Sequence, residues 1–262
     1  MTKVTIATWN VNSIRARLPR LIPWLKERKP DIVCLQETKV VDELFPQEPI
    51  EELHYNIVTY GQKTYNGVAI LSKSPMEDIT RGLPGEDETA EKRALAVRTM
   101  DFHVLNLYVV NGKEVGSDKY VYKLEWLKKL RDYIKDEFDL ERERVVLTGD
   151  FNITFDDLDV YDPKAWEGKI LCSEPERQAL KELLDLGLID AFRRLHGKEE
   201  GQYTWWDFRT RAFKRGNRGL RIDHFLLSKP AMEVCTKVWI DREARDGEKP
   251  SDHAPVLAEF EV

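Results

Sequence analysis

The sequence has little cysteine, and no apolar stretch in it is long enough to cross a bilayer. The three cysteines, Cys34, Cys172 and Cys235, cannot all pair with one another, so reduced thiols are favoured over a disulfide framework. The first residues, MTKVTIATWN, lack the apolar segment of a secretory signal. These absences predict a cytoplasmic protein with no membrane partner.

The chain also lacks glycine- or serine-rich linkers, low-complexity segments and convincing internal repeats. Its 262 residues lie within the range of one large α/β domain, and 42% of them are hydrophobic, which is enough for a sizeable core. We therefore expect a single domain over residues 1–262.

Short apolar runs dominate the pattern of the chain. Helical spacing of apolar residues predicts helices over 118–138 and 174–186, and a third helix is expected over about 18–28, with Pro23 restricting its start. The runs that are typical of β-strands are KVTIATW, DIVCLQ, GVAILS, ALAVRTM, FHVLNLY, RVVLTG, RIDHFLL and APVLAEFEV. The apolar face predicted for the 118–138 helix consists of Val121, Leu124, Leu127, Leu130, Ile134 and Phe138. Strands outnumber helices and several are consecutive, which indicates mixed sheets covered by helices.

Six of these strand-like runs end or begin abruptly in a polar residue. One such residue alone is more often a strand-end cap than a ligand, but strands that run in opposite directions bring the end of one and the start of the other to the same sheet edge. The residues concerned are Asn10, Glu37, Tyr108, Asp150 and Asn152 at strand ends, and Asp223, Asp252 and His253 at strand starts. We expect them to meet at one rim of the sheets.

The chemistry of this rim is that of phosphodiester hydrolysis. Carboxylates with an amide are hard oxygen ligands that suit Mg²⁺, whereas no cysteine–histidine cluster has the spacing of a zinc site. His253 beside carboxylates can carry a positive charge near neutral pH. Asp150 and Asn152 offer a base and an amide on one face of an extended segment. Neither a G-x-S-x-G nucleophile motif nor a P-loop occurs, so water is the expected nucleophile.

The order and spacing of these motifs resemble those of a known family. The strings TWNVNSIRAR, CLQETK, YNGVAILSK, NLYVVNG, LTGDFN, YTWWDFRTRAF, NRGLRID and KPSDHAPV are similar to those of exonuclease III-type apurinic/apyrimidinic endonucleases, from residue 4 to about 260. That group belongs to the endonuclease/exonuclease/phosphatase superfamily, which includes pancreatic deoxyribonuclease. The resemblance implies a deoxyribonuclease-like α/β fold, a four-layer αββα sandwich with two packed mixed β-sheets.

The resemblance also implies a function in DNA repair. The expected reaction is Mg²⁺-dependent hydrolysis of the phosphodiester 5′ to an abasic site, with Mn²⁺ as a substitute, together with 3′–5′ exonuclease and 3′-phosphatase activity. The expected partner is double-stranded DNA with abasic sites or damaged 3′ ends. A monomer associated with the nucleoid in the cytoplasm is also implied.

The metal region is assigned by motif. Glu37 resembles the principal metal ligand, with Asn10 and Asp252 near the metal. Some relatives have aspartate where this chain has Asn12, and since asparagine is the weaker ligand, a second metal site is in doubt.

The resemblance assigns the catalytic residues in the same way. Asp150 is expected to activate the attacking water, and Asn152 and Tyr108 to contact the scissile phosphate. His253 would polarise that phosphate while Asp223 holds the imidazole.

A basic and aromatic stretch, residues 203–221, precedes Asp223 in this acidic protein of net charge −6. In an ordinary protein such a stretch would be a solvated loop. Beside a phosphodiesterase centre, its cations are expected to bind the phosphates of the DNA backbone. The other DNA contacts expected from the resemblance are Arg209, Arg218, Arg15, Asn111 and Lys39. Trp205, Leu220 and Ile222 would wall a small apolar pocket for the flipped abasic sugar, or else be ordinary core residues.

Two other functions compete with this interpretation. A phosphatase or phosphodiesterase of the same fold could act on inositol phosphates, lipids or RNA tails, and it would not need the basic stretch. A catalytically silent nucleic-acid-binding module would be expected to lose some metal or base residues, and none is missing here.

Overall fold

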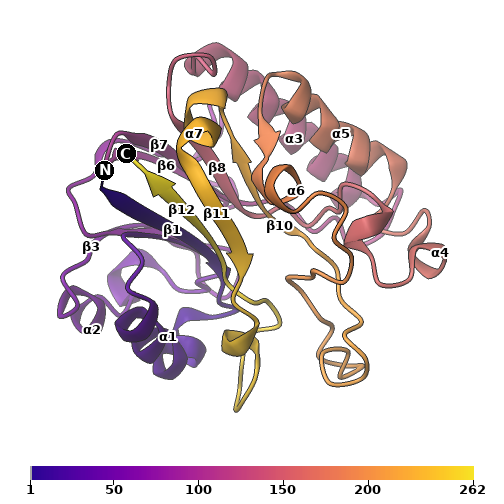
Figure 1. Ribbon diagram of the computed structural model, residues 1–262, viewed down its shortest axis with the longest axis horizontal. Coiled ribbons are helices and arrows are strands. Elements are labelled where there is room, and N and C mark those ends of the chain that lie inside the picture. The colour runs from indigo at the N-terminus through magenta and orange to yellow at the C-terminus, as the bar shows by residue number, and fades with distance from the viewer. Residues whose placement is uncertain (1) are drawn as a thin grey trace.

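Two six-stranded β-sheets form the centre of the computed structural model, which describes residues 2–262 (Figure 1). Sheet I has the order β11 (Cys235–Ile240), β12 (Val256–Glu261), β1 (Lys3–Asn10), β2 (Ile32–Gln36), β4 (Val68–Ser72) and β3 (Asn56–Tyr60). Sheet II has the order β5 (Glu77–Arg81), β6 (Ala94–Thr99), β7 (Phe102–Tyr108), β8 (Val145–Asp150), β10 (Asp223–Leu227) and β9 (Ile189–Asp190). Both sheets are mixed, because β1–β2 and β7–β8 are parallel pairs and the other pairs are antiparallel.

Helices cover the outer face of each sheet, which gives the four αββα layers expected (Figure 1). Helix α1 (Ile14–Arg28) and the short α2 (Glu48–Glu51) lie on sheet I, and α3 (Asp118–Glu137) and α5 (Glu174–Asp185) lie on sheet II. The remaining helical segments are α4 (Pro163–Trp166), α6 (Ala191–His196), α7 (Lys229–Val234), η1 (Asp42–Leu44), η2 (Asp157–Asp159) and η3 (Arg242–Arg245). None of the helices within residues 2–262 is both long enough and apolar enough to span a membrane.

The core lies in three apolar layers. One fills the space between the sheets and includes Ile6 of sheet I and Val104 and Phe225 of sheet II. The others join sheet I to α1 and sheet II to α3 and α5. Because the central strands are covered on both faces, they are apolar almost without interruption, as in the fully buried IVCLQ of β2. This explains why eight strands were visible as continuous apolar runs.

All eight predicted strands are confirmed, as are the helices expected over 118–138 and 174–186. The start predicted for the first helix is wrong, because α1 begins at Ile14 and contains both Pro19 and Pro23. The two prolines are four residues apart on an exposed face, where water can satisfy the carbonyl groups that lose their amide partners. Ser13 caps the helix by accepting a hydrogen bond from the Ala16 amide.

Strand register brings the predicted rim residues together. In sheet II, Tyr108 at the end of β7 lies opposite Asp150 at the end of β8, and Asp150 lies opposite Asp223 at the start of β10. In sheet I, Asn10 ends β1, and Glu37 follows β2 directly. The rim predicted from the strand ends is therefore present in the structure.

Gly149 allows Asp150 to reach this position. Its φ angle is 144°, and a Cβ atom there would lie 1.9 Å from the Leu107 carbonyl oxygen. We expect Gly149→Ala to lower the free energy of unfolding by about 3 kcal/mol or more, since the neighbouring backbone cannot move aside cheaply. Gly116→Ala is the matched control, because Gly116 also has a positive φ but nothing lies near its Cβ position. Urea unfolding measures both variants, and equal losses would contradict this account.

Candidate active site

Asn10 joins the carboxylates of the two sheets at the centre of the rim. Its Nδ2 donates to Glu37 Oε1 over 2.9 Å and to Asp150 Oδ2 over 2.8 Å. Its Oδ1 accepts from the backbone amide of Asn12 over 3.0 Å, which fixes the orientation of the side-chain amide. Both hydrogens of the Asn10 amide are therefore directed at carboxylates, and the residue spaces Glu37 from Asp150.

His253 lies between two buried carboxylates. Its Nδ1 is 2.8 Å from Asp223 Oδ2, and its Nε2 is 3.6 Å from Asp150 Oδ2. Burial alone would lower the pKa of His253, but the attraction of Asp223 and Asp150 outweighs it and raises that pKa to about 10. Burial also raises the pKa of Asp150, to about 7, although the positive charge of His253 opposes this shift. The site thus contains an imidazolium beside a carboxyl group that can exchange a proton near neutral pH.

The residues before His253 attach this part of the chain to the rest of the rim. Ser251 Oγ donates to the Asn10 carbonyl over 2.6 Å. Asp252 accepts from Asn12 Nδ2 over 2.9 Å and from Trp205 Nε1 over 3.1 Å. In this arrangement Asp252 orients its neighbours through both carboxylate oxygens.

Two further predicted residues lie beside Asp150. Burial and the Glu37 carboxylate raise the pKa of Tyr108 well above its usual value, so its phenol stays protonated and can donate a hydrogen bond. Asn152 donates through Nδ2 to the Val109 carbonyl over 3.0 Å, and its Oδ1 accepts from Asn111 Nδ2 over 3.0 Å. The two amides are thus held against each other at the rim.

A buried ion pair supports these amides from below. Lys123 of α3 has no solvent-exposed side-chain surface, and its Nζ donates to the carbonyls of Asn152, over 2.8 Å, and Asn111, over 3.2 Å, and to the Glu176 carboxylate. Glu176 also accepts from the amide and hydroxyl of Ser173 at the start of α5. Burial lowers the pKa of Lys123, which Glu176 opposes.

Sequence reasoning missed this pair. Within the predicted apolar face of α3, Val121 is half exposed, and the buried face instead contains Tyr120, Lys123 and Trp126. The sequence did contain a signal for Lys123, because this lysine occurs at the helical spacing of the buried apolar residues. The S-x-x-E pattern of a capping box marked Glu176.

Glu37 is the residue best suited to hold a divalent cation. Its carboxylate is partly exposed, and its Oε2 already attracts a cation, the Lys39 ammonium, at 2.7 Å. The oxygen donors at this position fit Mg²⁺ or Mn²⁺. Asp150, Asp223 and His253 also lie close enough together to bind a metal, but His253 itself supplies the positive charge between those two carboxylates.

The predicted DNA-contacting residues differ in accessibility. Arg218, Arg15 and Asn111 are exposed, and Arg209 is exposed beside Asp207. Arg209 and Arg218 lie on the loop between residues 203 and 221, which projects from the sandwich, in orange in Figure 1. Lys39 instead has its ammonium on Glu37 and on Asn12 Oδ1.

Arg221 differs from what was expected of the basic stretch 203–221, because it does not lie on the protein surface. It is fully buried and forms ion pairs with Asp159 and Asp190, at 2.7 Å in each case. Its charge is therefore neutralised inside the protein and is not available to a phosphate.

The apolar pocket expected around Trp205 is closed in the structure. Leu220 and Ile222 are 0% and 1% exposed, since they pack with Val160, Leu171 and Cys172 from a distant part of the chain. Trp205 alone keeps partial exposure beside this cluster. Leu220 and Ile222 are thus buried among core residues in this structure, which is the alternative that the sequence left open.

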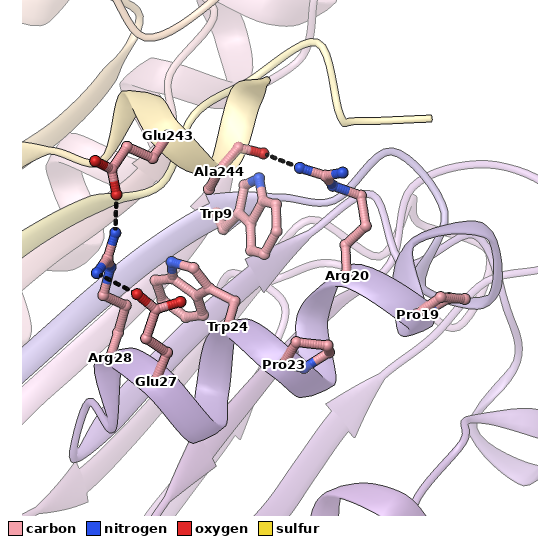
Figure 2. Close-up of a pocket in the computed structure, with 9 residues that line it drawn as sticks. All are labelled: Trp9, Pro19, Arg20, Pro23, Trp24, Glu27, Arg28, Glu243 and Ala244. Atoms are coloured by element: carbon pink, nitrogen blue, oxygen red, sulfur yellow. Dashed lines mark hydrogen bonds and ion pairs between the residues drawn. The ribbon is translucent and has the colours of Figure 1, made fainter. Parts of the chain in front are cut away.

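A separate cleft of about 270 Å³ lies between α1 and η3 (Figure 2). Trp9 and Trp24 line it with ring centroids 5.3 Å apart, and Arg20 donates across it to the Ala244 carbonyl. None of the predicted site residues lines this cleft. Trp9, which lines the cleft, donates through Nε1 to the carbonyl of His253 over 3.2 Å.

Comparison with known proteins places the chain in a family. The pattern of the Endonuclease/Exonuclease/phosphatase family matches residues 7–253, so the chain belongs to that family. It is 38% identical to exodeoxyribonuclease III of Haemophilus influenzae, over 97% of this chain and 98% of that protein. These matches confirm the resemblance found in the motifs.

Solved structures narrow the class further. An AP endonuclease from Archaeoglobus fulgidus is 40% identical with a TM-score of 0.94, over 99% of this chain and 100% of that one. A Neisseria 3′ phosphatase bound to a product DNA hairpin is 43% identical with a TM-score of 0.95, with the same coverage. The protein is therefore a hydrolytic nuclease of the exonuclease III and AP endonuclease type.

Removal of the buried lysine tests the support of the two amides. Lys123→Met leaves the Glu176 carboxylate buried without its partner, so we expect the free energy of unfolding to fall by about 3–5 kcal/mol. Lys119→Met, at an exposed position of the same helix, should change it by less than about 0.5 kcal/mol. Urea unfolding compares the two, and a Lys123→Met variant as stable as the Lys119→Met control would show that the pair does not stabilise the fold.

Proposed function

We propose that this nuclease hydrolyses the phosphodiester 5′ to an abasic site in double-stranded DNA, with Mg²⁺ as cofactor. We further propose 3′–5′ exonuclease and 3′-phosphatase activity at damaged 3′ ends. The observation that carries the proposal is that the rim holds two distinct groups of charged residues. Asp150, whose carboxyl group can exchange a proton, lies beside the charged His253, and Asn10 holds Asp150 beside a separate carboxylate, Glu37.

Asp150 is proposed to be the general base. It accepts from Asn10 Nδ2 at Oδ2 and from the Asn152 backbone amide, over 2.9 Å, at Oδ1. Each carboxylate oxygen has a second lone pair, so one of them can take a proton from the attacking water. A pKa near neutrality suits that transfer.

His253 is proposed to stabilise the charge that develops on the phosphate. Its Nδ1 is bound to Asp223, which leaves the Nε2–H side toward Asp150 and the reacting groups. Tyr108 and the second amide hydrogen of Asn152 can donate to the same phosphate. Donors that are fixed before the reaction lower the barrier because they need no rearrangement.

Glu37 would hold the Mg²⁺ or Mn²⁺ ion, while Asn10 and Asp252 orient the groups around it. The bound ion would neutralise charge on the phosphate. Asn10 directs its amide hydrogens at carboxylates, so it is proposed as a spacer of the site and not as a direct ligand.

Charge and comparison both support DNA as the substrate. Arg209, Arg211, Lys214, Arg215 and Arg218 are exposed on one projecting loop, which is the pattern expected for backbone phosphate contacts. One of the similar structures contains a product DNA hairpin. A phosphatase for a small soluble substrate would have no use for such a loop.

The direct test is cleavage of a labelled duplex with a single abasic site. We expect incision 5′ to that site with Mg²⁺ and none with a chelator, and much slower cleavage of the intact duplex. Duplexes with a recessed 3′ end or a 3′-phosphate measure the other two activities. If these 3′ ends are processed and the abasic duplex is not, the endonuclease part of the proposal is wrong.

Substitutions separate chemistry from binding. We expect Asp150→Asn and His253→Asn each to lower the turnover number by about 10²–10⁴ with little change in DNA affinity. Arg218→Ala should do the reverse, because it removes an exposed phosphate contact and reduces the salt dependence of binding. Single-turnover kinetics and DNA-binding titrations measure both effects. Equal losses of binding and cleavage in the Asp150 and His253 variants would mark a structural role.

A further inference from the structure

The Lys39 ammonium is held at the carboxylate proposed to bind the metal. Its Nζ lies 2.7 Å from Glu37 Oε2 and 2.6 Å from Asn12 Oδ1. About a quarter of the Lys39 side chain is exposed, so it is not a freely moving surface lysine. Its contacts place one positive charge directly on Glu37.

The backbone fixes this arrangement. Lys39, Glu37 and Asn12 have φ angles of 55°, 50° and 45°, which non-glycine residues rarely adopt. The amide of Lys39 donates to the Asn66 carbonyl over 2.9 Å, and the amide of Thr38 donates to the Gly67 carbonyl over 3.1 Å. Three left-handed residues around one carboxylate indicate a position built for this contact.

Both oxygens of the Glu37 carboxylate already have a partner. Asn10 donates to Oε1, and Lys39 occupies Oε2. Asn12, the other partner of Lys39, is neutral, so the ion pair of Lys39 is with Glu37. A divalent ion that approaches Glu37 therefore meets a carboxylate that a cation has already neutralised, and like charges at this distance repel each other.

We propose that Lys39 is a built-in competitor of the divalent ion. Its ammonium takes the place of the ion on Glu37 in the metal-free protein, keeps this carboxylate from being left unpaired, and must be displaced when the ion binds. This inference rests on the proposed metal dependence of the function. It predicts that the protein binds its ion weakly and exchanges it readily.

Metal binding to the DNA-free protein tests the competition. Lys39→Met is expected to bind Mn²⁺ about 10-fold more tightly than the wild type, as measured by calorimetry and by the free-Mn²⁺ electron paramagnetic resonance signal. Lys39→Gln keeps a donor for Glu37 without the charge and should behave in the same way. Lys63→Met, at an exposed position in a nearby loop, is the control and should leave the affinity unchanged.

Thermal unfolding gives an independent readout. Without metal, Lys39→Met should melt below the wild type, because Glu37 loses its charged partner. Added Mg²⁺ should then raise its melting temperature more than it raises that of the wild type.

In a Glu37→Gln background the Lys39 substitution should no longer tighten Mn²⁺ binding.

The outcomes are distinguishable. Equal Mn²⁺ affinity in the wild type and both Lys39 variants would overturn the competition and leave the proposed metal site intact. Failure of every variant to bind Mn²⁺ would overturn the inference together with the proposed metal dependence.

Discussion

The hydrogen bonds of the Asn10 amide are the interaction on which the site depends. One amide hydrogen binds Glu37, which directly follows β2 of sheet I, and the other binds Asp150 in sheet II. Two carboxylates at one rim would repel each other, and a neutral donor between them reduces that repulsion without adding a charge. The same contacts tie the two sheets together at the end where Asp223 and His253 meet across them. The two hydrogen bonds of Asn10 therefore both position the carboxylates of the site and connect the two sheets.

Two cations, His253 and Lys39, are paired with three carboxylates of the rim. The His253 imidazolium belongs to Asp223 and Asp150, and the Lys39 ammonium belongs to Glu37. Burial makes an unpaired charge costly, so these pairs keep the protein stable before any substrate arrives. The pairing also makes the two halves of the rim chemically different. The half with Asp150 and His253 is proposed to take a proton from water and to stabilise charge on the phosphate, and the half with Lys39 is proposed to exchange its ammonium for a metal ion.

The strand framework and much of the rim could be predicted from the sequence, because buried strands are apolar runs and a polar residue at the end of such a run is conspicuous. Strand β5, with every residue exposed, shows no such pattern and was missed. Lys123 was missed because a lysine in a helix normally faces water. Leu220 and Ile222 are buried because they pack with Leu171 and Cys172, which are distant in sequence. No local pattern could therefore reveal their burial.

The most direct test of this charge arrangement is the position of Mn²⁺ in crystals, located by anomalous diffraction. We predict an ion bound to a carboxylate oxygen of Glu37, with the Lys39 ammonium moved away from it. His253 should remain between Asp150 and Asp223 with no ion there. An ion bound among Asp150, Asp223 and His253 instead, with Lys39 still on Glu37, would contradict the account.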